Sequence, residues 1–128
     1  MTAKDFFLSW GMVLAGVVMN VAGIYIVKLK INNIGAIQFD SMRVVVEYFL
    51  TLAKSPLAII GGILIMAAPF PYAIALSRMQ LSMAYPLSIA LNCAIILPLS
   101  IIFLGESVTV NKLTAIGMVL ISLYFLYK

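Results

Sequence analysis

Residues 6–27, FFLSWGMVLAGVVMNVAGIYIV, form a run of 22 residues without a formal charge. As an α-helix, which rises about 1.5 Å per residue, a run of this length crosses the roughly 30 Å hydrocarbon layer of a bilayer. Two comparable uncharged runs follow, from Ser55 to Ser77 and from Met79 to Gly105. The sequence therefore predicts an all-α membrane protein.

The composition agrees with this prediction, since 65% of the residues are hydrophobic and only 9% are charged. The charged residues fall between or beside the apolar runs, where they mark span ends. The last run is short, but Glu106 and Lys112 can reach toward the headgroups. We therefore predict a single domain, residues 1–128, with four transmembrane helices at about 6–27, 56–76, 82–104 and 108–127. Short connections after the second and third spans favour a compact antiparallel bundle.

The long connection between the first two spans has a helical pattern of its own, at about residues 39–54. Its polar residues are spaced three to four apart, and apolar residues fill the opposite face, which predicts an interfacial amphipathic helix. Such a helix either braces the bundle or acts as a gate or guide for lipid headgroups. The polar face contains Asp40, Arg43, Glu47, Thr51 and Lys54, and the apolar face contains Phe39, Met42, Val45, Val46, Phe49, Leu50 and Ala53.

Prolines and small residues interrupt the spans. Pro69 and Pro71, inside the second span, predict a bent helix beside a transport route, and a static kink is the alternative. Pro86 lies within the third span. Five small residues of the first span would let another helix approach closely. They are Gly11, Ala15, Gly16, Ala22 and Gly23.

No charged residue lies at the centre of a span, whereas proton-coupled antiporters keep an ionisable group there. The first span has Asn20 instead. Tyr85, Ser88 and Asn92 follow one face of the third span at helical spacing and form a polar stripe, with Tyr25 and Tyr72 as further polar residues in the spans. These groups either contact a polar headgroup or hold helices together by hydrogen bonds.

Other classes of function are disfavoured by the composition. With a single cysteine, Cys93, and no histidine, no metal site and no cofactor are expected, and no catalytic constellation can be assembled, so we do not predict an enzyme. The net charge of +4 favours anionic lipid headgroups or substrates. Nucleic acid is not an expected partner.

Several short motifs resemble a known family. Asn20-Val21-Ala22-Gly23 followed by Lys28, Ala84-Tyr85-Pro86, Gly105-Glu106 and the segment Thr114–Ile121 resemble the small multidrug resistance type proteins of the drug/metabolite transporter superfamily. The resemblance covers nearly all of the chain.

Two positions and one connection separate this chain from the drug exporters of that family. Where those exporters have an essential glutamate, this chain has Asn20, and where they have a tryptophan it has Ser88. The long amphipathic connection is similar instead to the small paired subunits proposed to flip undecaprenyl-phosphate-linked aminoarabinose. The resemblance therefore implies a flippase subunit of the bacterial inner membrane.

The implied activity is movement of an anionic lipid-linked sugar, such as a polyprenyl phosphate-linked sugar, between leaflets. Lys28, Lys30 and Arg43 are candidates to attract the phosphate, although ordinary membrane anchoring explains basic residues equally well. Asn20, Tyr85, Ser88 and Asn92 are candidates to replace water around the headgroup.

Four spans are too few to enclose a headgroup, so the chain is expected to pair with itself or with a related four-span subunit. Glu106 is expected to have a structural role at the start of the last span, where a carboxylate accepts from free backbone amides. The alternatives are a small cation exporter and a non-transporting partner of a membrane glycosyltransferase.

Overall fold

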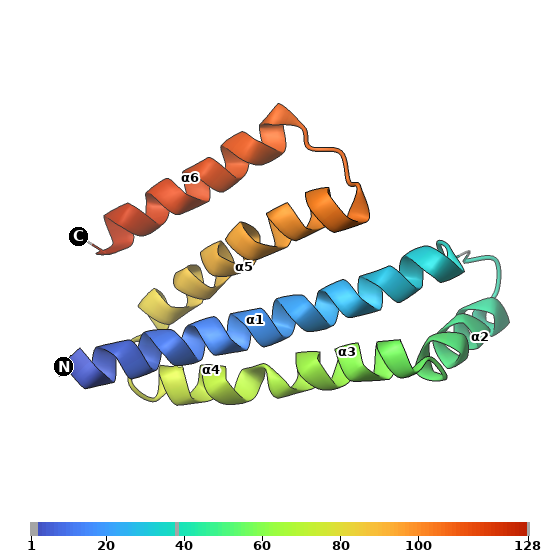
Figure 1. Cartoon of the computed structure of the whole chain (residues 1–128), viewed down its shortest axis with the longest axis horizontal. Coiled ribbons are helices and arrows are strands. Elements are labelled where there is room, and N and C mark those ends of the chain that lie inside the picture. Colours follow the sequence, from blue (N-terminus) through green and yellow to red (C-terminus); the bar gives the residue numbers. More distant parts are fainter. Residues whose placement is uncertain (1–2, 38, 128) are drawn as a thin grey trace.

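The computed structural model describes residues 3–37 and 39–127, and within these ranges it contains six helices and no strand. The prediction of an all-α protein is confirmed. Figure 1 shows α1, the collinear pair α3 and α4, α5 and α6 running alternately along the long axis, with α2 at one end. The helices are α1 (Ala3–Ile34), α2 (Met42–Ala53), α3 (Pro56–Ala67), α4 (Pro69–Leu76), α5 (Leu81–Leu104) and α6 (Val110–Tyr127).

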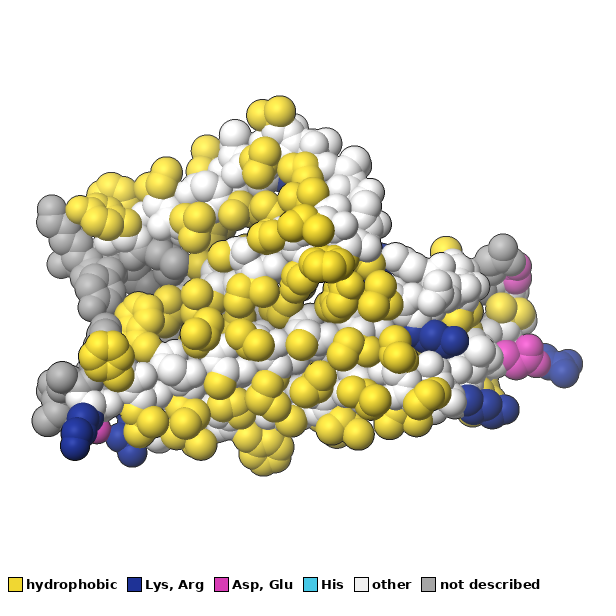
Figure 2. Space-filling model, viewed as in Figure 1, with side chains coloured by type: hydrophobic (Ala, Val, Ile, Leu, Met, Phe, Trp, Pro, Cys, Tyr) yellow, Lys and Arg dark blue, Asp and Glu magenta, His cyan; other side chains and the backbone are white. Residues whose placement is uncertain are grey.

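Three helical segments of the described chain are long and apolar enough to cross a membrane: Phe7–Ile34, Pro56–Leu76 and Leu81–Leu104. They correspond to the first three predicted spans and indicate a membrane-embedded, multi-pass protein. The apolar part of α6, Val110–Ser122, is shorter. On the face shown in Figure 2, hydrophobic side chains cover the middle of the molecule and the Lys and Arg side chains gather toward the ends of its long axis.

The first helix is longer than the predicted span. It continues beyond Val27, through Lys28 and Lys30, to Ile34. Lysine is compatible with helix, so it changes the polarity of the surface without ending the backbone hydrogen-bond ladder. The predicted end of the span at Val27 therefore marks the limit of the apolar surface and not the limit of the helix.

Two ion pairs connect α1 to distant parts of the chain, one near each end. Arg78 Nη1 lies 2.9 Å from Asp5 Oδ1, and Lys28 Nζ lies 3.9 Å from Glu106 Oε1. Along α1, Asp5 and Lys28 are separated by about 35 Å, at about 1.5 Å per residue. This separation is close to the thickness of a hydrocarbon layer, so the two pairs lie where its boundaries would be.

The predicted placement of Glu106 at the start of the last helix is wrong. Glu106 lies in the non-helical connection 105–109, and α6 begins only at Val110. Gly105, with a φ of +63°, ends α5, and the Glu106 N–H donates to the Ser100 carbonyl at 3.1 Å. The left-handed glycine turns the chain away from the helix axis. This turn places the Glu106 carboxylate near Lys28.

Glycines bring α1 and α3 into backbone contact. A Cβ atom on Gly23 would lie 2.6 Å from the Gly61 carbonyl oxygen, and one on Gly61 would lie 2.8 Å from the Gly23 carbonyl oxygen. Two turns earlier, a Cβ on Gly16 would lie 3.0 Å from the Ala68 carbonyl oxygen. The predicted close approach is confirmed at Gly16 and Gly23. At Gly11 the added Cβ would meet no described atom within 4 Å beyond the neighbouring residues and backbone of its own helix.

The second apolar segment is interrupted at the predicted prolines. α3 and α4 are separated by Ala68 alone, which keeps helical angles of −56° and −35°. Pro69 and Pro71 have no N–H to donate, so the carbonyls of Ile65 and Ala67 lose their usual helical partners. By contrast, Pro86 and Pro98 lie within an unbroken α5.

The predicted amphipathic segment contains a shorter helix, α2. Ser41 is its N-cap and accepts from the Val44 N–H at 3.5 Å. None of its residues, all of which the structure describes, is buried, and the Met42 side chain is 80% exposed. Most of the apolar face of α2 is therefore exposed within the described chain.

We predict that Gly23→Ala lowers the stability of the fold while Gly11→Ala does not. The added methyl at Gly23 meets backbone atoms of α3 that cannot rotate away, and overpacking of this kind costs about 1–3 kcal/mol. Both substitutions carry the same gain in helix propensity, so Gly11→Ala is a matched control on the same helix. The melting temperature of each variant in detergent checks this, and equal melting temperatures would contradict it.

Candidate functional site

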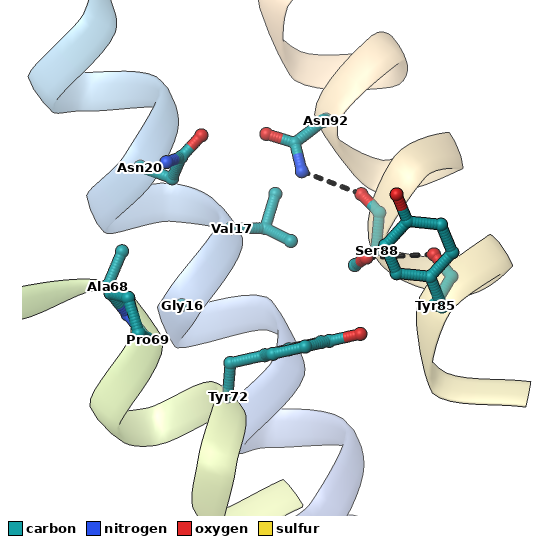
Figure 3. A pocket seen from close by; sticks show the side chains of 9 residues that line it. All are labelled: Gly16, Val17, Asn20, Ala68, Pro69, Tyr72, Tyr85, Ser88 and Asn92. Atoms are coloured by element: carbon teal, nitrogen blue, oxygen red, sulfur yellow. Dashed lines mark hydrogen bonds between the residues drawn. The ribbon is translucent and has the colours of Figure 1, made fainter. Parts of the chain in front are cut away.

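A pocket lies where α1, the α3–α4 junction, α4 and α5 meet, and it has a volume of about 230 Å³. In Figure 3, α1 and α4 lie on one side of the pocket and α5 lies on the other. α6 supplies none of the described residues that line it. The lining residues are Gly16, Val17, Asn20, Ala68, Pro69, Tyr72, Tyr85, Ser88 and Asn92.

The structure brings together all four neutral residues of the predicted site. Asn20 comes from α1, and Tyr85, Ser88 and Asn92 come from three successive turns of one face of α5. Pro69 also lines the pocket, so the break between α3 and α4 borders it directly.

The other predicted residues lie elsewhere. The basic residues Lys28, Lys30 and Arg43 do not line the pocket, nor do Pro71 and Pro86. Lys28 is paired with Glu106, and Arg43 Nε lies 3.2 Å from Glu47 Oε1 on the exposed surface of α2. The predicted site therefore divides into a neutral group in the pocket and a basic group outside it.

The polar side chains of α5 form hydrogen bonds within their own helix. The Ser88 hydroxyl donates to the Tyr85 carbonyl and the Asn92 amide donates to the Ser88 carbonyl, both at 2.8 Å. Neither bond uses the acceptor lone pairs of the Ser88 hydroxyl or of the Asn92 side-chain carbonyl. Across the pocket, the amides of Asn20 and Asn92 point toward each other (Figure 3). Within the described chain, no side-chain hydrogen bond joins Asn20 to α5, so these groups do not act there as interhelical links.

Tyr72 is the polar residue of the pocket that the predicted site does not include. Its side chain extends from α4 toward Tyr85 and Ser88 on α5 (Figure 3). The hydroxyl oxygen is buried and has no hydrogen-bond partner among the residues that the structure describes. The signal in the sequence is its spacing, because Tyr72 follows Pro69 by three residues and therefore shares its helix face. Sequence alone does not show which face of that span turns inward.

The pocket lies midway along α1 between the residues of its two ion pairs, Asp5 and Lys28, a position we call mid-depth. It carries no formal charge. Val17, which is 3% exposed, lies about 18 Å from Asp5 and about 17 Å from Lys28 along α1. No Lys, Arg, Asp or Glu is among the described residues that line the pocket. Tyr85 is 58% exposed, so the pocket reaches the side of the bundle. A polar group can therefore enter at this depth while its attached chain remains outside.

Comparisons with models of protein families, with characterised proteins and with solved structures find no match for this chain. The functional argument therefore depends on the chemistry of the pocket and of the surrounding surface.

We predict that the pocket is hydrated. In a Cys93→Ser background, Ser88→Cys is expected to react with a small, membrane-impermeant thiosulfonate roughly tenfold faster, or more, than Ile89→Cys, because the thiolate that reacts forms only in contact with water. Ile89 is the adjacent residue and is 41% exposed on α5, but it lies outside the pocket. Labelling measured by mass spectrometry in vesicles checks this. Equal rates at the two positions would indicate a dry pocket.

Proposed function

We propose that this chain is a subunit of a membrane flippase that moves an anionic lipid-linked sugar, or a similar amphiphile, between the leaflets. The observation that carries the proposal is the neutral, polar pocket at mid-depth that reaches the side of the bundle. A headgroup cannot cross hydrocarbon unaided, because each polar group loses its hydrogen bonds to water. A groove of neutral donors and acceptors replaces those bonds, while the lipid tail stays in the bilayer.

The basic residues fit the same proposal at the boundary of the apolar layer. Lys28 lies about 12 Å along α1 from Asn20, at 1.5 Å per residue. Its ion pair with Glu106 is long, at 3.9 Å, and both side chains are almost half exposed, so the pair contributes at most about 1 kcal/mol. An arriving phosphate can therefore compete with Glu106 for Lys28. Lys30 and Arg43 extend the basic surface beyond the span.

The arrangement in the membrane is part of the proposal. α6 serves as the fourth span, and α2 lies in the interface with its exposed apolar residues, such as Met42, against lipid. The exposed apolar side chains of α6, including Met118, Tyr124 and Phe125, leave a surface for a second four-span subunit, identical or related. The membrane is the inner membrane of a bacterial cell, as the family resemblance implies.

A proton-coupled cation exporter is less compatible with the pocket. Exchange of a proton for a cation requires an ionisable group within the membrane, and Asn20 stands at that position. An amide does not titrate, so it cannot couple proton movement to cation binding.

Transport in vesicles tests the proposal. The purified chain, alone and with a related subunit, is expected to accelerate the movement of polyprenyl phosphate-linked glucose between leaflets. Asn20→Ala is expected to lower the rate roughly two- to tenfold, the equivalent of one lost hydrogen bond. Asn111→Ala, at the exposed start of α6, is the control and should transport as the wild type does. A rate unchanged by Asn20→Ala would count against this groove.

The ion pair gives a second test, with opposite results from its two partners. The double variant Lys28→Ala, Lys30→Ala is expected to weaken binding of polyprenyl phosphate, and to do so most at low salt. Glu106→Gln should strengthen that binding, because it leaves Lys28 without a competing carboxylate. Affinity measured at several salt concentrations checks both. If Glu106→Gln weakens binding as much as the lysine variant, the pair has a structural role instead.

A further inference from the structure

The Tyr72 hydroxyl is a buried polar group whose hydrogen bonding is not met by the described chain. Buried hydroxyls nearly always have a partner, because an unpaired one keeps the full cost of losing water. Tyr72 lines the pocket, but its hydroxyl oxygen is closed off from water in this conformation. A small rotation of the ring toward a bound ligand would give the hydroxyl the hydrogen bond that it lacks. The ligand must then offer a polar atom at the α4 side of the pocket.

The other polar groups of the pocket restrict what that ligand can be. Asn20 can both donate and accept, and the side-chain oxygens of Ser88 and Asn92 have acceptor capacity left after donating within α5. A ligand that satisfies this mixed set must donate as well as accept. Sugar hydroxyls do both, whereas a fully ionised phosphate only accepts.

Charge and size point in the same direction. A phosphate or an ammonium group in this pocket would have no opposite charge among the described lining residues, and an unpaired ion at this depth is costly. The pocket has a volume of about 230 Å³. This is below the range of about 300–1,000 Å³ usual for drug-sized ligands, so the pocket suits one ring and not a complete headgroup.

The apolar part of the lining completes the match. Val17, Ala68 and Pro69 present hydrocarbon, and Tyr72 and Tyr85 present aromatic rings beside their hydroxyls. A sugar ring has the corresponding division, with apolar C–H faces and a polar rim of hydroxyl groups. Aromatic side chains with a polar tip serve both parts.

We propose that the pocket takes the uncharged sugar ring of the headgroup, and that the Tyr72 hydroxyl determines this specificity by hydrogen bonding to a sugar hydroxyl. The inference deepens the proposed flippase function and rests on it for the identity of the lipid.

Equilibrium binding of two lipid probes tests the inference on the intact chain in nanodiscs. The probes are polyprenyl phosphate carrying one glucose and polyprenyl phosphate alone. The wild type is expected to bind the glucose-bearing lipid more tightly. Tyr72→Phe should weaken binding of that lipid roughly three- to tenfold, as expected for one hydrogen bond, and leave the bare phosphate unchanged.

Two controls separate specificity from structure. Tyr25→Phe removes a hydroxyl from α1 outside the pocket, where the ring packs edge-on against Phe103, and it should change neither affinity. The melting temperature of Tyr72→Phe should equal or exceed that of the wild type, because the lost hydroxyl has no partner in the described chain. A lower melting temperature, or an equal loss of affinity for both lipids, would overturn the inference by showing a structural role.

A third probe tests the requirement for a neutral ring. Polyprenyl phosphate carrying glucosamine, protonated at neutral pH, is expected to bind more weakly than the glucose-bearing lipid because its ammonium group finds no carboxylate in the pocket. Equal or tighter binding would overturn the assignment of a neutral ring.

Transport measured in parallel separates this inference from the proposed function. Movement of both lipids at the same rate, or movement that does not depend on Tyr72, would overturn the assignment of Tyr72. It would leave the proposed flippase function intact. Selective, Tyr72-dependent binding without movement of lipid between leaflets would support the sugar site and contradict the proposed flippase function.

Discussion

The backbone contact between Gly23 and Gly61 is the constraint on which the rest of this structure depends. Each glycine lies so close to the carbonyl oxygen of the other that neither position has room for a Cβ atom. The same packing continues at Gly16 against Ala68, where α3 gives way to α4. It thereby fixes Asn20 on one helix relative to Tyr72 on another. In a bilayer, where burial of apolar surface gives little drive for association, such close packing is a main source of order.

The charges of the chain are arranged to leave that interior neutral. The ion pairs Asp5–Arg78 and Lys28–Glu106 lie near opposite ends of the apolar part of α1, and the pocket lies between them. At the ends, ions keep contact with water and cost little. At mid-depth the pocket is lined by amides and hydroxyls, which can form hydrogen bonds without holding an ion in hydrocarbon. The division suits a ligand that has charged and uncharged parts.

Much of the pocket could be predicted because a polar side chain is unusual inside an apolar run. Asn20, Tyr85, Ser88 and Asn92 stand out by that contrast alone, and helical spacing places the last three on one face. Tyr72 could not be assigned, because its position depends on the rotation of α4, which the contacts of Gly16 and Ala68 decide. The length of α1 beyond Val27 and the position of Glu106 could not be predicted from the sequence either. The first depends on backbone hydrogen bonding, which charge does not interrupt, and the second depends on the turn at Gly105.

The junction at Ala68 has a mechanical consequence. Pro69 and Pro71, on either side of Phe70, leave two backbone carbonyls of the α3–α4 segment without helical hydrogen bonds, so its bending stiffness is lowest there. α3 is anchored on one side of this joint by Gly61, while α4, on the other side, carries the Tyr72 wall. A small rotation of α4 about Ala68 would widen or narrow the pocket without disturbing the contact between α3 and α1.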